Sequence, residues 1–129
     1  MNIEKYKVYG TEKFYLNDFD TKDTAGFDSS ESVKNIIEQN IVEISSLQSM
    51  FYADGKIALL IIFQAMDAAG KDSATNSWYI IPADKKWFSQ AIDLNILLYM
   101  MKEFNPEYPV ITRLQEMMLE ESKYKLTEQ

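Results

Sequence analysis

The chain has 129 residues, the size of one domain, and 47 % of them are apolar while 26 % are charged, which is ordinary for a globular protein with a core. Its net charge of −7 argues against a general nucleic-acid binder and against a protein that binds anionic membranes, since both need a basic face. The absence of Cys and His excludes thiol and imidazole catalysis. Any chemistry must therefore use carboxylates, Lys, hydroxyls, backbone amides or a hard cation held by oxygen.

The N-terminal segment is polar and lacks the apolar centre of a secretory signal. The longest apolar stretch, residues 57–63, is far shorter than the roughly 20 residues that span a bilayer. We therefore expect a cytoplasmic protein that makes no contact with a membrane.

Residues 1–28 are predicted to form an irregular arm. Asp, Thr and Gly crowd residues 18–26, and these residue types favour turns. Apolar side chains such as Tyr6, Phe14 and Phe27 are scattered through the same segment, and such groups need a surface to pack on. We therefore expect the arm to wrap the rest of the domain.

Residues 29–52 are predicted to form a long amphipathic helix. The segment from Asp28 to Glu31 has the pattern of a capping box, and apolar residues then recur at helical spacing from Val33 to Phe51. Gly55 suits the left-handed conformation that often ends a helix. The apolar side of this helix indicates core packing rather than a binding surface.

Residues 57–63, called the apolar run from here on, are predicted to form a strand. The run is short, continuously apolar and rich in β-branched residues, which is typical of a parallel strand covered on both faces. Residues 78–81 are a second strand candidate, followed by Pro82. A helix capped by Asp84 is expected to end near Phe104, and residues 114–119 suggest a last short helix.

The connection between the two predicted strands, residues 64–77, is too short to hold a phosphate loop and a helix that crosses back over a sheet. We therefore do not expect residues 78–81 to lie parallel beside the apolar run. Two alternatives remain: these residues pair antiparallel, or the helix of the loop continues into them and erases the strand. A sheet of two strands is marginal unless helices or another chain cover it.

Residues 65–72 stand directly after the apolar run, where a phosphate-binding loop would stand. Backbone amides that curl around an anion need small side chains, and Ala68, Ala69 and Gly70 supply them. Lys71 is placed to reach phosphates as a point charge. The pattern alone is as compatible with a chance loop as with a phosphate site.

Two departures from the usual G-x-x-x-x-G-K-[ST] pattern carry further information, because Ala65 replaces the first Gly and Asp72 replaces the hydroxyl residue. Residues 58–73, with M-D-A-A-G-K-D at their centre, closely resemble the Walker A region of the polyphosphate kinase 2 family. A second block, residues 78–88, resembles the last strand and the start of the C-terminal helix of that family. The resemblance extends over most of the chain.

The resemblance implies roles for individual residues. Lys71 would contact the transferred phosphates, and Asp67 would place Mg²⁺ or the accepting phosphate, so that both count as catalytic and Asp67 as the metal ligand. The implied phosphate- and nucleotide-binding residues are Ala68, Ala69, Gly70, Lys71, Asp72 and Ser73. Lys85 and Lys86 are better explained as exposed side chains at a helix start than as nucleotide ligands.

Members of that family are longer, and their two blocks lie far apart, whereas here six residues separate Lys71 from Trp78. The second acidic motif and the Arg-rich lid have no counterpart, so the chain resembles a family member without its central segment. The implied fold class is α/β, an incomplete P-loop kinase-like three-layer fold, helix-rich with a small residual sheet. It forms a single domain with an arm (1–28), a helix, strand and phosphate loop (29–75), and a C-terminal strand and helices (76–129).

The resemblance implies a Mg²⁺-dependent phosphotransferase acting between inorganic polyphosphate and a nucleoside mono- or diphosphate. Phosphoryl transfer depends on cationic stabilisation, yet the chain has one Arg, Arg113, outside both blocks. We therefore expect no turnover, or very weak turnover, from this chain by itself. Two alternatives stay open: an anion-binding module, and a non-catalytic remnant or interaction subunit that forms homo- or hetero-oligomers through its long helices.

Overall fold

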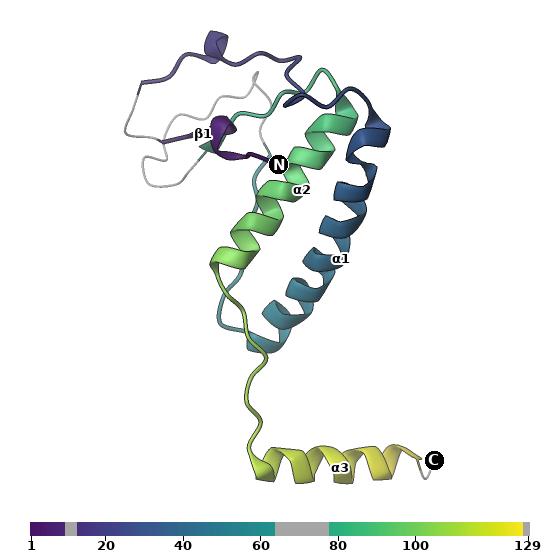
Figure 1. Cartoon of the computed structure of the whole chain (residues 1–129). Coiled ribbons are helices and arrows are strands. Elements are labelled where there is room, and N and C mark those ends of the chain that lie inside the picture. Colours follow the sequence, from purple (N-terminus) through teal and green to yellow (C-terminus); the bar gives the residue numbers. More distant parts are fainter. Residues whose placement is uncertain (10–12, 64–77, 128–129) are drawn as a thin grey trace.

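A computed structural model describes residues 1–9, 13–63 and 78–127 (Figure 1). In chain order its elements are the 3₁₀ helix η1 (Glu4–Tyr6), β1 (Lys7–Val8), the 3₁₀ helix η2 (Leu16–Asp18), α1 (Ser30–Asp54), β2 (Trp78–Tyr79), α2 (Lys86–Glu103) and α3 (Arg113–Thr127). The described part is therefore helix-rich with one two-stranded sheet, which agrees with the α/β class and the small residual sheet expected from the sequence.

Helix α1 confirms the first predicted helix, with ends shifted by one or two residues. Its N-cap is Ser29, whose amide donates to Ser32 Oγ at 3.4 Å while that hydroxyl donates to the Ser29 carbonyl at 2.6 Å. The capping box thus lies one residue later than the predicted segment that began at Asp28. Gly55 ends the helix with a φ of 63°, as predicted, and its amide donates to the carbonyl of Phe51 at 3.0 Å.

Helix α2 lies beside α1, and both helices run in the same direction (Figure 1). At their C-terminal ends the rings of Phe51 and Phe104 meet edge to face, with centroids 6.1 Å apart. An ion pair between Glu43 and Lys102 bridges the two helices at the surface. Because the helices are parallel, the residues between them connect the C-terminal end of α1 with the N-terminal end of α2, and the apolar run follows α1 after Gly55 and Lys56.

The core joins the N-terminal arm to α2. Ile3, Tyr6, Phe88 and Ile92 form one buried cluster, in which the Tyr6 and Phe88 rings lie 6.2 Å apart, edge to face. Part of the arm therefore packs on the domain, as predicted. Its middle does not, because Phe14 and Tyr15 remain 46 % and 68 % exposed.

The sheet pairs the arm with the second predicted strand. β1 and β2 are antiparallel, with Lys7 opposite Tyr79, and the Ile80 amide extends the ladder by donating to the Tyr6 carbonyl at 2.8 Å. The second predicted strand is therefore present and antiparallel, but its partner is the arm and not the apolar run. Apart from the scattered apolar residues of the arm, no sequence pattern indicates β1.

The apolar run differs from its prediction. Within the described part of the chain, residues 57–63 form neither helix nor strand, and Leu60, Ile62 and Phe63 are 82 %, 73 % and 74 % exposed. A strand forms only against another strand, and β2 is paired with β1 instead. The buried parallel strand expected here is therefore absent from this structure.

Helix α3 is longer than the short helix predicted over residues 114–119. It begins after Thr112, whose hydroxyl accepts from the Gln115 amide at 3.4 Å, while the Thr112 amide donates to Gln115 Oε1 at 2.8 Å. Every side chain described in α3 is exposed, and the helix stands apart from the pair formed by α1 and α2 (Figure 1).

Candidate functional site

All the residues expected to bind phosphate, nucleotide or metal lie in one segment, 64–77, outside the described residues. They are Asp67, Ala68, Ala69, Gly70, Lys71, Asp72 and Ser73. Their roles stay predictions. The structure does describe the two flanks of the segment, which are the apolar run before it and β2 after it.

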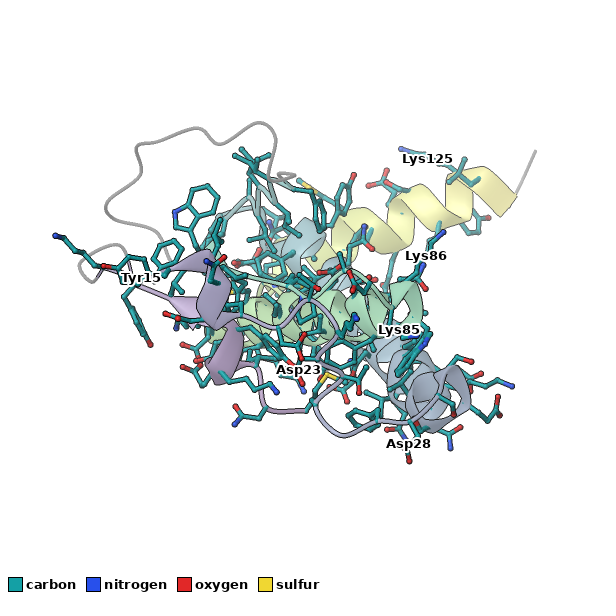
Figure 2. The ribbon with its side chains drawn as sticks, turned by 90° about the horizontal axis from the view of Figure 1, so that it is seen from above. Tyr15, Asp23, Asp28, Lys85, Lys86 and Lys125 are labelled. Carbon is teal, nitrogen blue, oxygen red and sulfur yellow. The ribbon has the colours of Figure 1, made fainter. Side chains whose placement is uncertain are left out.

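The flank after the segment leads into α2. Lys85 is the N-cap residue and Lys86 the first residue of the helix, and both side chains are exposed (Figure 2). The Asp84 amide donates to the Thr21 carbonyl at 3.3 Å, and its carboxylate accepts from the Thr21 hydroxyl at 3.1 Å. Asp84 therefore ties the arm to the start of α2, and the role predicted for it as N-cap is wrong, because Lys85 holds that position.

The best-connected polar cluster of the described residues lies where the arm meets the core. Asp23 Oδ2 accepts from the Tyr6 hydroxyl at 2.7 Å and from Lys5 Nζ at 2.5 Å, and its Oδ1 accepts from the Ala25 amide at 2.9 Å (Figure 2). Tyr6 is buried at 2 % exposure, while Lys5 and Asp23 keep contact with solvent. These bonds help to hold the arm against Phe88 and Ile92 of α2.

The protonation states of this cluster follow from its contacts. Burial alone would raise the pKa of Asp23, but the hydrogen bonds from Lys5, Tyr6 and the Ala25 amide outweigh it and lower the pKa to about 2. Burial, and then the bond to Asp23, raise the pKa of Tyr6 to about 12. The bond to Asp23 also raises the pKa of Lys5. The three groups are therefore locked as a carboxylate, a neutral phenol and an ammonium at neutral pH.

An open cavity of about 470 Å³ borders this cluster. Its walls are Lys5, Tyr6, Asp18, Phe19, Asp20, Asp23 and Pro82. Three carboxylates against one ammonium make it unsuited to a phosphate or a polyphosphate. Because the Asp23 oxygens already have partners, the cluster acts as a structural fastening of the arm. This cluster was not predicted, since the only sequence signal for it is the presence of Tyr6 and Asp23 in a segment rich in turns.

The described residues also lack the metal ligands and cations that phosphoryl transfer would need at one place. They contain no group of three or more Asp or Glu side chains arranged to hold a metal ion. Arg113, the only Arg of the chain, is the first residue of α3 and is exposed. Within the part of the chain that the structure describes, no helix is both long and apolar enough to cross a membrane.

Comparison with known proteins gives two relatives. The chain is 38 % identical over 72 residues, 56 % of its length, to the ADP-polyphosphate phosphotransferase of Rhodopseudomonas palustris. It is 36 % identical over 73 residues, 54 % of its length, to the AMP/ADP-polyphosphate phosphotransferase of Meiothermus ruber. The match spans 25 % of the first relative and 27 % of the second. No family model and no solved structure matches the chain.

Proposed function

We propose that the chain is related to the polyphosphate kinase 2 enzymes and carries the phosphate-loop portion of their P-loop kinase-like fold. The observation that carries this proposal is the M-D-A-A-G-K-D sequence at residues 66–72, directly after an apolar run, in a chain similar to two named polyphosphate phosphotransferases. The substrates of that chemistry are inorganic polyphosphate and a nucleoside mono- or diphosphate. Lys71 binds the transferred phosphates, and residues 68–73 surround them with backbone amides.

The donor chemistry of the segment fits Mg²⁺. Asp67 offers a hard carboxylate oxygen, and Mg²⁺ in phosphotransferases is typically held by one or two carboxylates together with substrate phosphates. When bound, the ion would neutralise charge on the phosphate oxygens. In this chain Asp67 would orient that ion or the accepting phosphate, and Lys71 would hold the phosphates in place.

By itself, this chain is expected to catalyse phosphoryl transfer slowly or not at all. Positioning and cationic stabilisation supply most of the catalysis in phosphoryl transfer, and the single Arg of the chain lies in α3. The net charge of −7 repels polyphosphate instead of steering it inward. The apolar run that precedes the loop is also without a sheet in the described structure, so the usual rigid base of a phosphate loop is lacking.

Thermal unfolding with and without Mg²⁺-ATP and Mg²⁺-polyphosphate tests the proposal. A ligand that binds only the folded chain at 100 times its Kd adds about 2.7 kcal/mol of stability and raises the melting temperature. Lys71→Ala should abolish this shift, whereas Lys34→Ala, which removes an exposed Lys from α1, should leave it unchanged. A cooperative transition that neither ligand moves would refute phosphate binding.

An assay for nucleotide formed from polyphosphate then separates a binding module from an enzyme. We expect little or no product even where the thermal shift is present. Robust, Lys71-dependent turnover would overturn our inference that the catalytic machinery is incomplete.

A second candidate function is a non-catalytic interaction subunit. Among the described residues, 24 large apolar side chains are exposed, against nine buried apolar residues. Five of the exposed residues lie together in the apolar run, and a contiguous exposed apolar patch is typical of an interaction surface.

A further inference from the structure

The exposed surface of this chain is too large for a compact monomer. A folded monomer of 15.0 kDa exposes roughly 7,000 Å² according to the usual scaling of surface with mass. This chain exposes 10419 Å². The largest apolar contributions from the described residues come from two places, which are the apolar run and α3.

The apolar run lacks both a neighbouring strand and a cover. Ile57, Leu60, Ile61, Ile62 and Phe63 are 41 %, 82 %, 45 %, 73 % and 74 % exposed. Such a run is stable when a neighbouring layer of helices covers it. The described residues cover this run only in part, since Leu60, Ile62 and Phe63 remain largely exposed.

Helix α3 is the second exposed apolar surface, because the side chains described on all its sides are exposed to solvent. Leu114, Met117, Met118 and Tyr124 share one side of it and are 62 %, 61 %, 56 % and 64 % exposed. The ion pair between Glu121 and Lys125 interrupts this side, so its apolar part is centred on the first two turns. An isolated helix of 15 residues is marginal in water, and α3 therefore needs packing to persist.

We propose that α3 of one copy lies on the apolar run of a second copy, and that the second copy returns the same contact, so that a two-fold dimer forms. Each chain contains one exposed apolar run and one exposed amphipathic helix. Two equivalent contacts, related by a two-fold axis, would cover both surfaces in both copies and leave none open for a third copy. The contact places the apolar side of a helix on an apolar segment, so that both remove apolar side chains from water. In the single chain this contact is not made, since both surfaces are exposed.

The available area agrees with a stable dimer. At roughly 200 Å² for a large apolar residue, the exposed fractions of the five residues of the run and the four of α3 leave at most about 1,100 Å² per copy for an interface. A standard stable interface buries about 800 Å² per partner. The two surfaces together are therefore sufficient, while either of them alone would fall short.

The net charge of the chain determines whether salt strengthens or weakens dimer formation. Each copy carries a net charge of −7, so two copies repel each other at long range. Salt screens this repulsion and leaves apolar burial intact. Dimer formation should therefore strengthen from low to moderate ionic strength, whereas an assembly held by ion pairs would weaken.

The first experiment is sedimentation equilibrium of the full chain over a range of concentrations and two ionic strengths. We expect a reversible equilibrium between 15.0 kDa and twice that mass, shifted toward the dimer by salt. A chain that stays monomeric over the whole range of concentrations overturns the proposal, and so does an assembly that dissolves as salt rises.

The second experiment uses exposed positions, so that the fold of the single chain is not disturbed. Leu60→Asp on the run and Met117→Glu on α3 should each raise the dimer Kd at least about tenfold, because each change affects both symmetric contacts. Val42→Glu, at a position of α1 that is 69 % exposed, is the matched control and should leave the Kd unchanged. Circular dichroism of each variant checks that the helical content is retained. An equal effect of all three changes would refute a specific contact.

Mixing the two variants tests the reciprocal pairing itself. In a mixed dimer the intact α3 of the Leu60→Asp chain meets the intact run of the Met117→Glu chain, so one of the two contacts is restored. We expect the mixture to form dimers at concentrations at which neither variant does so alone. A dimer that is not recovered on mixing would overturn the proposed exchange, because the intact α3 and the intact run would then not bind each other. This outcome is independent of phosphate binding at Lys71.

Discussion

Replacing Asp23 with Asn tests whether the cluster of Lys5, Tyr6 and Asp23 fastens the arm to the core. The Asp23 pKa lies at about 2 in the folded chain, against 3.8 for the ordinary carboxyl, a difference that corresponds to roughly 2 kcal/mol before screening. The side chains of Lys5 and Asp23 are 41 % and 27 % exposed, and solvent screens such a pair strongly. We therefore expect Asp23→Asn to lower the free energy of unfolding by about 1 kcal/mol at pH 7.

The stability that Asp23 contributes should change with pH, and the direction of its pKa shift determines how. Because folding lowers the pKa of Asp23, its contribution is fully present above the ordinary pKa of 3.8 and is lost as the pH falls through about 2. Urea unfolding followed by circular dichroism between pH 6 and pH 2 measures the difference between the original chain and the variant. That difference should shrink from about 1 kcal/mol toward zero as Asp23 becomes protonated.

The matched control is Asp18→Asn, which removes the same charge from an exposed position of η2 in the same arm. It should change the stability by less than about 0.5 kcal/mol. A difference between Asp23→Asn and the original chain that stays constant down to pH 2 would refute our reasoning, because it would show that the loss is not electrostatic.

Three further predictions concern the packing of the helices. Phe88→Ala removes a fully buried ring from the core cluster and should cost about 3–5 kcal/mol, enough to abolish the cooperative thermal transition of so small a core, as measured by calorimetry. Gly55→Ala should cost about 1 kcal/mol in urea unfolding, because a φ of 63° is unfavourable for Ala although its Cβ would meet no neighbour within 4 Å. A double-mutant cycle with Glu43→Gln and Lys102→Met should give a coupling of at most about 1 kcal/mol, since both partners are exposed, and a larger value would contradict that assignment.

The helices were predictable from the sequence because their signals are local. The apolar spacing from Val33 onward and the left-handed Gly55 locate α1 to within two residues, since the hydrogen bonds of a helix join residues four apart. The same holds for α2, whose predicted end at Phe104 lies one residue beyond its observed end. The extent of α3 was underestimated, because its last turns contain charged residues in place of an apolar signal.

The sheet was not predictable in the same way, because a strand depends on a partner that may lie anywhere in the chain. Residues 57–63 have the composition of a buried strand but find no strand beside them, whereas Lys7 and Val8, with weak strand character, pair with β2. The fastening of Tyr6 by Asp23 is non-local for the same reason, since the two residues are 17 positions apart. Sequence spacing does not reveal either contact.

The position of the apolar run links the two proposals made for this chain. Residues 65–72 follow the run directly in the sequence, so the precision with which the backbone amides of residues 68–73 can be presented to a phosphate depends on how firmly the run is held. Leu60, Ile62 and Phe63 are largely exposed, so the described residues cover this part of the run only slightly. A layer that covers the run from outside, as α3 of a second copy would, also orders the segment that leads into the loop. Assembly and phosphate binding are then expected to favour each other, because ligand and partner both stabilise the ordered run.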